Sequence, residues 1–131
     1  MPIPSSITVA DRAPTPVDHT FVPNAPLNGG IGFVSSDGVR IADKKLGITL
    51  RQTGSKLRSR MLLSVPVVVD ETINGITQKK VVRSAYAEVL FTFEDTSTTQ
   101  EQDDLVGMTA NLLAAGQTGV IPVVTGRESY F

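Results

Sequence analysis

Hydrophobic and polar residues alternate with a period of two along much of the first two-thirds of the chain. The segment 45–51 shows this most clearly, because Leu46, Ile48 and Leu50 fall on one side. The other side carries Lys45, Gly47, Thr49 and Arg51. Such alternation is typical of a β-strand with one face on a core and the other in solvent.

Two longer strands are predicted next. In the run 56–69 one face carries Arg58, Arg60, Leu62 and Ser64. In the run 81–95, the longest strand candidate, one face carries Ser84, Tyr86, Glu88 and Leu90. Asn74-Gly75 lies between these runs and is flanked by isoleucines, which indicates a β-hairpin. Pro66 cannot donate to a ladder, so it predicts a bulge or a sheet edge.

Shorter strands precede these. Residues 7–9, 20–22 and 31–35 form short β-branched or aromatic runs. A proline-rich segment at 11–19 and a turn at Ser36-Asp37-Gly38 interrupt them.

The period changes to a helical one after residue 95. Leu105, Met108 and Leu112 recur at helical spacing, and Thr98 with Glu101 matches a capping box. Gly116 is placed to end this helix, and a short second helix is predicted to begin near Pro122.

The order of elements predicts one α+β domain over residues 1–131. Its parts are an antiparallel meander sheet over about residues 5–94 and helices at about 98–115 and 121–127. One helix and a short second piece cannot cover both faces of such a sheet. We therefore expect one sheet face to meet solvent or a ligand, and the helix to pack on another subunit.

Composition excludes several classes of protein. The chain has 131 residues, 40% hydrophobic and 19% charged, which is ordinary for a globular domain. It has no cysteine, so disulfides, thiolate catalysis and zinc held by sulfur are excluded. No apolar run approaches a membrane span, and the first residues lack the pattern of a signal peptide. The formal net charge of −1 means that any basic surface must be local.

Candidate catalytic residues are few. His19 is the one histidine, and nothing in the sequence pairs it with a nucleophile or a metal, so a turn or surface histidine is the favoured interpretation. The acidic pair Asp103-Asp104 has a structural reason to lie at a helix start. Gly29-Gly30-Ile31-Gly32 lacks the spacing of a phosphate-binding loop. The sequence therefore predicts neither an enzyme nor a cofactor or metal.

The distributed cations are more informative. Lys45 and Arg51 lie on one face of the first strand, and Arg58 and Arg60 lie on one face of the following strand. A hairpin between the two strands would bring these cations together. A sheet face in solvent carries charges in any case. By pattern alone, an ordinary solvated face is slightly favoured over a binding face. Tyr86 on the polar side of its strand can stack on an unpaired base, although it can equally be half-covered by neighbours.

These residues resemble a known family. Nearly the whole chain is similar, in order, to the coat proteins of the single-stranded RNA bacteriophages, the leviviruses. The matching pieces are TPVDHTFVP, ITLRQ, SVPVVV, TINGI, VVRSAYAEVLFTF, STTQEQDDLVGMTANLLAA and the aromatic end Tyr130-Phe131.

The resemblance implies a fold and a function. The fold is an N-terminal β-hairpin, a five-stranded antiparallel sheet and two C-terminal helices, in an intertwined dimer whose helices cross the partner's sheet. The function is a virion capsid protein that self-assembles into an icosahedral shell in the cytoplasm of a bacterial host. Such proteins also bind a viral RNA hairpin, for genome packaging and translational repression. The alternative is a cellular oligomeric RNA-binding regulatory domain that forms no shell.

The resemblance also implies an RNA-binding face. Its members are Lys45, Gly47, Thr49, Arg51, Arg58, Arg60, Leu62, Ser64, Tyr86 and Glu88. Gly47 and Leu62 stand where some relatives have a hydroxyl and a lysine, and Arg60 stands where a hydroxyl is common. Glu88 stands where the family often has a polar base-reading residue, so the preferred hairpin is expected to differ.

Overall fold

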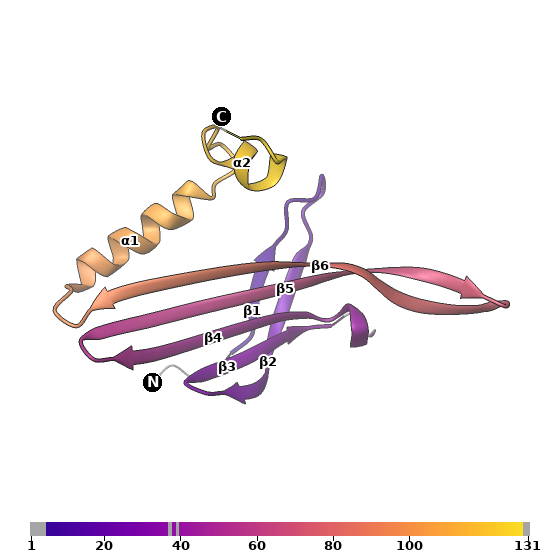
Figure 1. Cartoon of the computed structure of the whole chain (residues 1–131), viewed down its shortest axis with the longest axis horizontal. Helices are drawn as coiled ribbons and strands as arrows, with labels where there is room; N and C mark the ends of the chain where they lie inside the picture. The colour runs from indigo at the N-terminus through magenta and orange to yellow at the C-terminus, as the bar shows by residue number, and fades with distance from the viewer. Residues whose placement is uncertain (1–4, 37, 39, 130–131) are drawn as a thin grey trace. The chain divides into compact units, whose positions relative to one another are not determined.

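The computed structural model describes residues 5–36, 38 and 40–129. By internal contacts the chain divides into two compact units, Met1–Thr92 and Phe93–Phe131. The elements of the chain are labelled in Figure 1. They are β1 (Ile7–Ala10), β2 (Asp18–Leu27), β3 (Gly30–Ser35), a 3-10 turn (Arg40–Ala42), β4 (Lys44–Thr53), β5 (Lys56–Ile73), β6 (Ile76–Glu94), α1 (Thr99–Leu112) and α2 (Ile121–Gly126).

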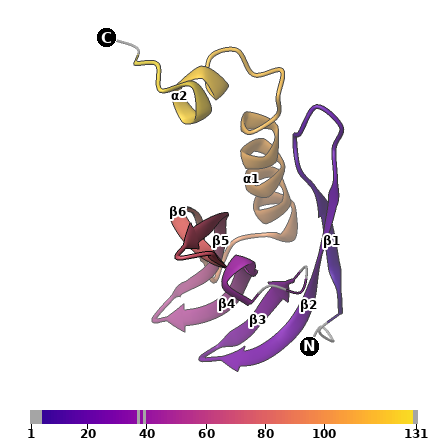
Figure 2. The ribbon, with the colours of Figure 1, turned by 90° about the vertical axis from the view of Figure 1, so that its right-hand side faces the viewer.

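The six strands form one antiparallel meander in sequence order, β1-β2-β3-β4-β5-β6. β1 pairs with the first residues of β2, from Ala10↔Asp18 to Ile7↔Phe21. β3 pairs with the second half of β2, beginning at Val22↔Val34. This double use of β2 produces the predicted N-terminal hairpin, visible in Figure 2, and joins it to the other four strands of the sheet, β3 to β6. The predicted fold class is confirmed, with β1 counted as a sixth strand.

β5 and β6 form a long hairpin around a two-residue turn, as the sequence predicted (Figure 1). Asn74 and Gly75 both have a positive φ, at 53° and 79°. A turn with both central residues in this region matches the right-handed twist of the strands, and Asn-Gly adopts it at low cost. Thr72 and Thr77 share a hydrogen bond of 3.1 Å between their hydroxyls. Asp70 and Lys79 pair at 2.6 Å further along the same hairpin.

Pro66 occupies a position where β5 is paired on one side. The described register between β4 and β5 ends at Lys45↔Ser64, two residues before the proline. The missing N–H of Pro66 therefore breaks no bond of that ladder, which is consistent with the predicted sheet edge.

α1 begins as the sequence predicted and ends earlier. The Thr98 hydroxyl accepts from the Glu101 N–H at 3.2 Å, and the Glu101 carboxylate accepts from the Thr98 N–H at 3.3 Å. The predicted end near residue 115 is wrong, because the Leu113 N–H donates to the Ala110 carbonyl and tightens the last turn. α2 contains Pro122 in its first turn, as expected, and ends at Gly126.

Two predicted features touch residues outside the described ranges. The turn Ser36-Asp37-Gly38 includes residue 37, and the aromatic end Tyr130-Phe131 follows the last described residue. Of the turn, the structure shows that the Gly38 N–H donates to the Ser36 hydroxyl at 3.2 Å.

The single chain buries little apolar surface. Among the described residues, the buried hydrophobic side chains are Phe21 on β2 and Phe33 on β3, at 2% and 4% exposure. Neither α1 nor α2 has a buried residue. Large exposed hydrophobic side chains on α1 are Leu105, Val106, Met108 and Leu112. An apolar surface of this extent marks an interface with another molecule.

Candidate nucleic-acid interface

The β4–β5 hairpin places the predicted polar residues on one face. Residues directly opposite each other in an antiparallel pair point to the same side of the sheet. The register pairs Lys45 with Ser64, Gly47 with Leu62, Thr49 with Arg60 and Arg51 with Arg58. The two strand faces that the sequence predicted separately therefore form one surface.

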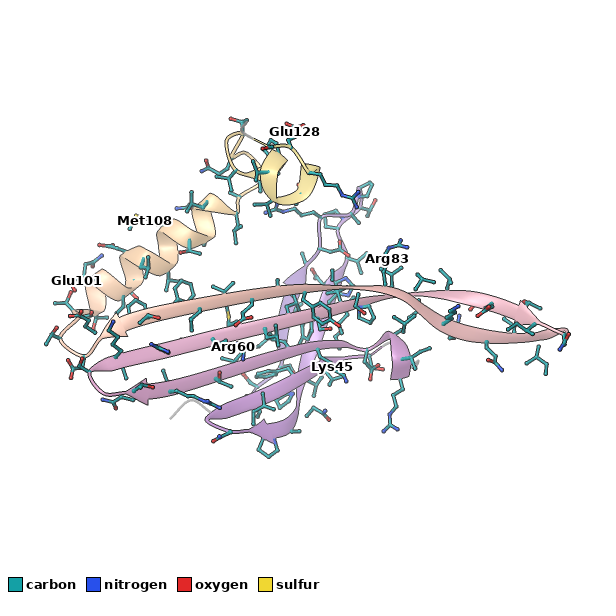
Figure 3. The ribbon with its side chains drawn as sticks, viewed as in Figure 1. Lys45, Arg60, Arg83, Glu101, Met108 and Glu128 are labelled. Atoms are coloured by element: carbon teal, nitrogen blue, oxygen red, sulfur yellow. The ribbon has the colours of Figure 1, made fainter. Side chains whose placement is uncertain are left out.

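An ion pair extends this surface to β6. Arg60 Nε lies 2.7 Å from Glu88 Oε1, which requires both side chains to project from the same side of the sheet. Tyr86 precedes Glu88 by two residues in β6, so it shares that side. Figure 3 labels Lys45 and Arg60 on this part of the sheet. We call the whole predicted set, from Lys45 to Glu88, the polar face.

A shallow pocket of about 340 Å³ lies on the polar face. Its lining residues are Thr49, Arg51, Thr53, Arg58, Arg60, Glu88 and Leu90. Thr53 and Leu90 were not among the predicted site residues. The same alternation could have identified them, because Thr53 lies two residues after Arg51 and Leu90 lies two residues after Glu88.

Like charges oppose each other in this pocket. Arg51 and Arg58 are direct partners across the ladder, and both are exposed. Like charges at directly opposite positions destabilise a sheet. A bound anion would relieve this repulsion.

The glycine at position 47 has a packing role. A Cβ atom on Gly47 would lie 3.3 Å from Leu27 Cδ1, so the Leu27 side chain fills the space over this glycine. Gly47 is paired with Leu62 on β5. Leu27 and Leu62 therefore form an apolar patch on the side of the sheet that carries the polar face. Leu27 was missed because its strand carries no local signal of a contact with β4.

His19 is held by a carboxylate outside the polar face. Its Nε2 atom lies 2.8 Å from Asp11 Oδ2. The same carboxylate accepts from the N–H groups of Ala13 and Val17, at 3.1 and 3.0 Å. Asp11 thus organises the connection between β1 and β2. His19 is not a turn residue, because it lies in β2 opposite Val9, but its partner is a structural carboxylate. Among the described residues, no group of three acidic, histidine or cysteine side chains is placed to hold a metal.

This connection predicts a local dependence on pH. Hydrogen bonds from the Val17 N–H, the His19 ring and the Ala13 N–H lower the pKa of the Asp11 carboxyl to about 2. Because the folded pKa is depressed, the stability that it contributes is fully present above about pH 4 and is lost as the pH falls towards 2. The measurement is hydrogen exchange of a peptide spanning residues 11–19, corrected for intrinsic exchange rates and followed by mass spectrometry. Protection of this peptide from exchange should increase as the pH is raised from about 2 to about 4.

Two variants check the assignment to Asp11. Asp11→Asn should remove the pH dependence and leave the segment poorly protected throughout. Asp18→Asn changes a nearby acid that pairs with Ala10 in the ladder and should keep the transition. An unchanged profile in Asp11→Asn would contradict the role of this carboxylate.

None of the helices in the described part of the chain is both long and apolar enough to cross a membrane.

A meander sheet with a cationic face is followed by two helices with exposed apolar side chains, and such exposed surface fits a protein that associates with another molecule. The chain belongs to the levivirus coat protein family, because the family model "Levivirus coat protein" matches residues 3–131. It is also 41% identical over 112 residues to the capsid protein of Pseudomonas phage PRR1, covering 84% of this chain and 85% of that protein.

Solved structures share the fold. The virus-like particle of bacteriophage ESE058 superposes with a TM-score of 0.84 at 22% identity, covering 99% of this chain and 100% of the other. That of Beihai levi-like virus 21 gives 0.83 at 25% identity, with 99% of both chains covered. The capsid protein of bacteriophage GA gives 0.80 at 21% identity, with 96% of both covered. Family membership confirms the predicted resemblance and establishes a structural capsid protein, not an enzyme.

Proposed function

We propose that this protein dimerises, assembles into an icosahedral shell in the cytoplasm of a bacterial host, and binds a viral RNA hairpin on its polar face. Hairpin binding would mark the genome for packaging and repress translation. The polar face would then line the inside of the virion.

The exposed apolar residues support assembly. α1 has no buried residue in the single chain, although Leu105, Met108 and Leu112 form an apolar stripe at helical spacing. In an intertwined dimer this stripe would pack against the sheet of the partner, which removes it from water. The solved relatives with this fold include virus-like particles, which supports a shell as the product of assembly.

The opposed arginines carry the RNA proposal. Arg51 and Arg58 face each other across the ladder, and phosphate oxygens are the natural counterions for guanidinium groups. We assign phosphate contacts to Lys45, Arg51, Arg58 and Arg60. Thr49 would hydrogen-bond an unpaired base. Tyr86 is 72% exposed, so its ring offers a stacking surface and does not serve as a packing residue in the single chain.

Electron microscopy and sizing of the expressed full chain test this function. We expect large uniform particles that contain nucleic acid, seen as a raised absorbance at 260 nm and lost after dissociation and nuclease treatment. The alternative, a cellular RNA-binding domain without a shell, predicts a discrete dimer at every concentration. That result would contradict the proposal.

A further inference from the structure

The chain contains the dipeptide Asn-Gly twice, and both copies lie in exposed turns. Asn28-Gly29 joins β2 to β3, and Asn74-Gly75 joins β5 to β6. Asparagine followed by glycine is chemically labile, because glycine has no side chain to shield its main-chain nitrogen and lets the backbone rotate widely. The two turns therefore have a similar intrinsic reactivity, and their surroundings decide which of them reacts first.

The turn at Gly29 is held by a third strand. The Gly29 carbonyl accepts a hydrogen bond of 2.9 Å from the Leu50 N–H on β4. A Cβ atom on Gly29 would lie 2.9 Å from the Leu50 carbonyl oxygen, so the turn lies directly against that strand. Rotation of the main chain at this turn has to break the contact with β4, which restrains the Gly29 nitrogen.

The turn at Gly75 has no such support in the single chain. A Cβ atom on Gly75 would meet nothing within 4 Å. The described ladder between β4 and β5 ends at Lys45↔Ser64, so the distal part of the β5–β6 hairpin extends as two strands beyond β4 (Figure 1). Ile73 and Ile76 beside the turn are 56% and 61% exposed. A two-stranded hairpin without a buried side chain at its tip is marginally stable in water, so this tip opens at low free energy.

We propose that Asn74 is a site of spontaneous deamidation, and that the open hairpin tip makes it react before Asn28. The Gly75 main-chain nitrogen loses its proton and attacks Cγ of the Asn74 side chain. The bond from Cγ to Nδ2 breaks, Nδ2 takes up a proton and leaves as ammonia, and a succinimide ring remains. Water then adds to one of the ring carbonyls and opens the ring. The net reaction consumes one water, releases one ammonia and needs no oxidant or reductant.

Each product changes the hairpin tip in a different way. Opening of the ring at Cγ leaves aspartate, and Asp-Gly still suits a turn in which both central residues have a positive φ. Opening at the main-chain carbonyl leaves isoaspartate, in which Cβ and Cγ of the side chain become part of the main chain. The lengthened main chain no longer fits the two-residue turn that fixes the register of β5 and β6. Both products add a negative charge at the tip.

Peptide mapping of the full chain by mass spectrometry tests the proposal. The protein is incubated at mildly alkaline pH, below the concentration at which particles form. Conversion of amide to acid is followed in the peptides that contain Asn28 and Asn74. We expect the Asn74 peptide to convert roughly tenfold faster, because the Asn28 turn must first break its contact with Leu50. Fragmentation of the product should show both isoaspartate and aspartate at position 74.

The same chain unfolded in urea is the internal control. Without the fold, the two Asn-Gly sequences should convert at similar rates. Equal rates in the folded protein, or faster conversion of Asn28, would overturn the proposal. A difference of the same size that persists in urea would also overturn it, because the neighbouring sequence and not the fold would then be the cause.

Asn74→Gly assigns the reaction to one side chain. The substitution removes the amide and keeps a turn sequence that accepts positive φ at both central positions. The tip peptide of this variant should show no conversion, while Asn28 converts at its wild-type rate. An unchanged acid signal from the tip peptide would place the reaction at another amide and overturn the assignment to Asn74.

A reversible cross-link tests whether opening of the tip is the cause. Thr72 and Thr77 face each other across the hairpin, with their hydroxyls 3.1 Å apart. Thr72→Cys combined with Thr77→Cys adds two cysteines to a chain that has none, at a cross-strand separation that a disulfide can span. The oxidised variant should convert Asn74 roughly tenfold more slowly than its reduced form. Equal rates in the two forms would overturn the role of tip opening.

Discussion

Leu112→Asp is expected to abolish both the dimer and the particles. Leu112 is 51% exposed in the single chain and lies in the last turn of α1, in line with Leu105 and Met108. If this stripe packs on the sheet of a partner, the substitution places an unpaired charge in an apolar interface. Such a charge costs on the order of 4 kcal/mol, which weakens association roughly a thousandfold for each copy. Sizing by light scattering and electron microscopy should show small species alone.

Asn111→Asp is the matched control for this variant. It adds the same charge in the same helical turn, so any cost from the negative end of the helix dipole is common to both variants. Asn111 lies about 100° around the helix from Leu112 and about 60° from Met108, just outside the stripe. We expect Asn111→Asp to assemble. Particles of normal size from Leu112→Asp would contradict packing of α1 on a partner.

Replacing Arg58 and Arg60 together by alanine is expected to produce the largest loss of RNA affinity. Arg58 faces Arg51 in the register and Arg60 lines the same pocket, so the double variant removes two of its three guanidinium groups. Each phosphate contact contributes roughly 0.7–0.9 to the slope of log affinity against log salt. We expect the slope to flatten by about 1.5 and affinity to fall roughly 30-fold or more at low salt. Titration of one hairpin at several salt concentrations measures both quantities.

Lys79 and Lys80 provide the control pair of cations. They lie on the distal part of β6, where they contact Asp70 and Glu71, and neither lines the pocket described above. Their double replacement by alanine changes the net charge by the same amount and should leave the slope nearly unchanged. Equal effects in the two double variants would mean that binding follows net charge, and would remove Arg58 and Arg60 from the proposed interface.

Most of the strand faces followed from the sequence because side-chain direction in a strand depends on local geometry. A period of two assigns Lys45, Thr49 and Arg51 to one side whatever the strand pairs with. The same holds for the Asn74-Gly75 turn and for the Thr98 cap, whose partners are neighbours in the chain. The end of α1 was less predictable, because the helix closes before Gly116 with an i→i−3 hydrogen bond from the Leu113 N–H to the Ala110 carbonyl.

The sequence by itself determined an α+β order, the alternating faces and a family resemblance, but left the polar face as two separate halves. The tertiary structure decided the register, which sets Arg51 against Arg58, and it brought Glu88 to Arg60 across 28 positions of the chain. It also placed Leu27 over Gly47. Strand register depends on turn length and on the packing of distant residues, and a slip of one residue would reverse every face. For that reason the members of the polar face were predictable from the sequence, whereas the contacts between them could be read only from the fold.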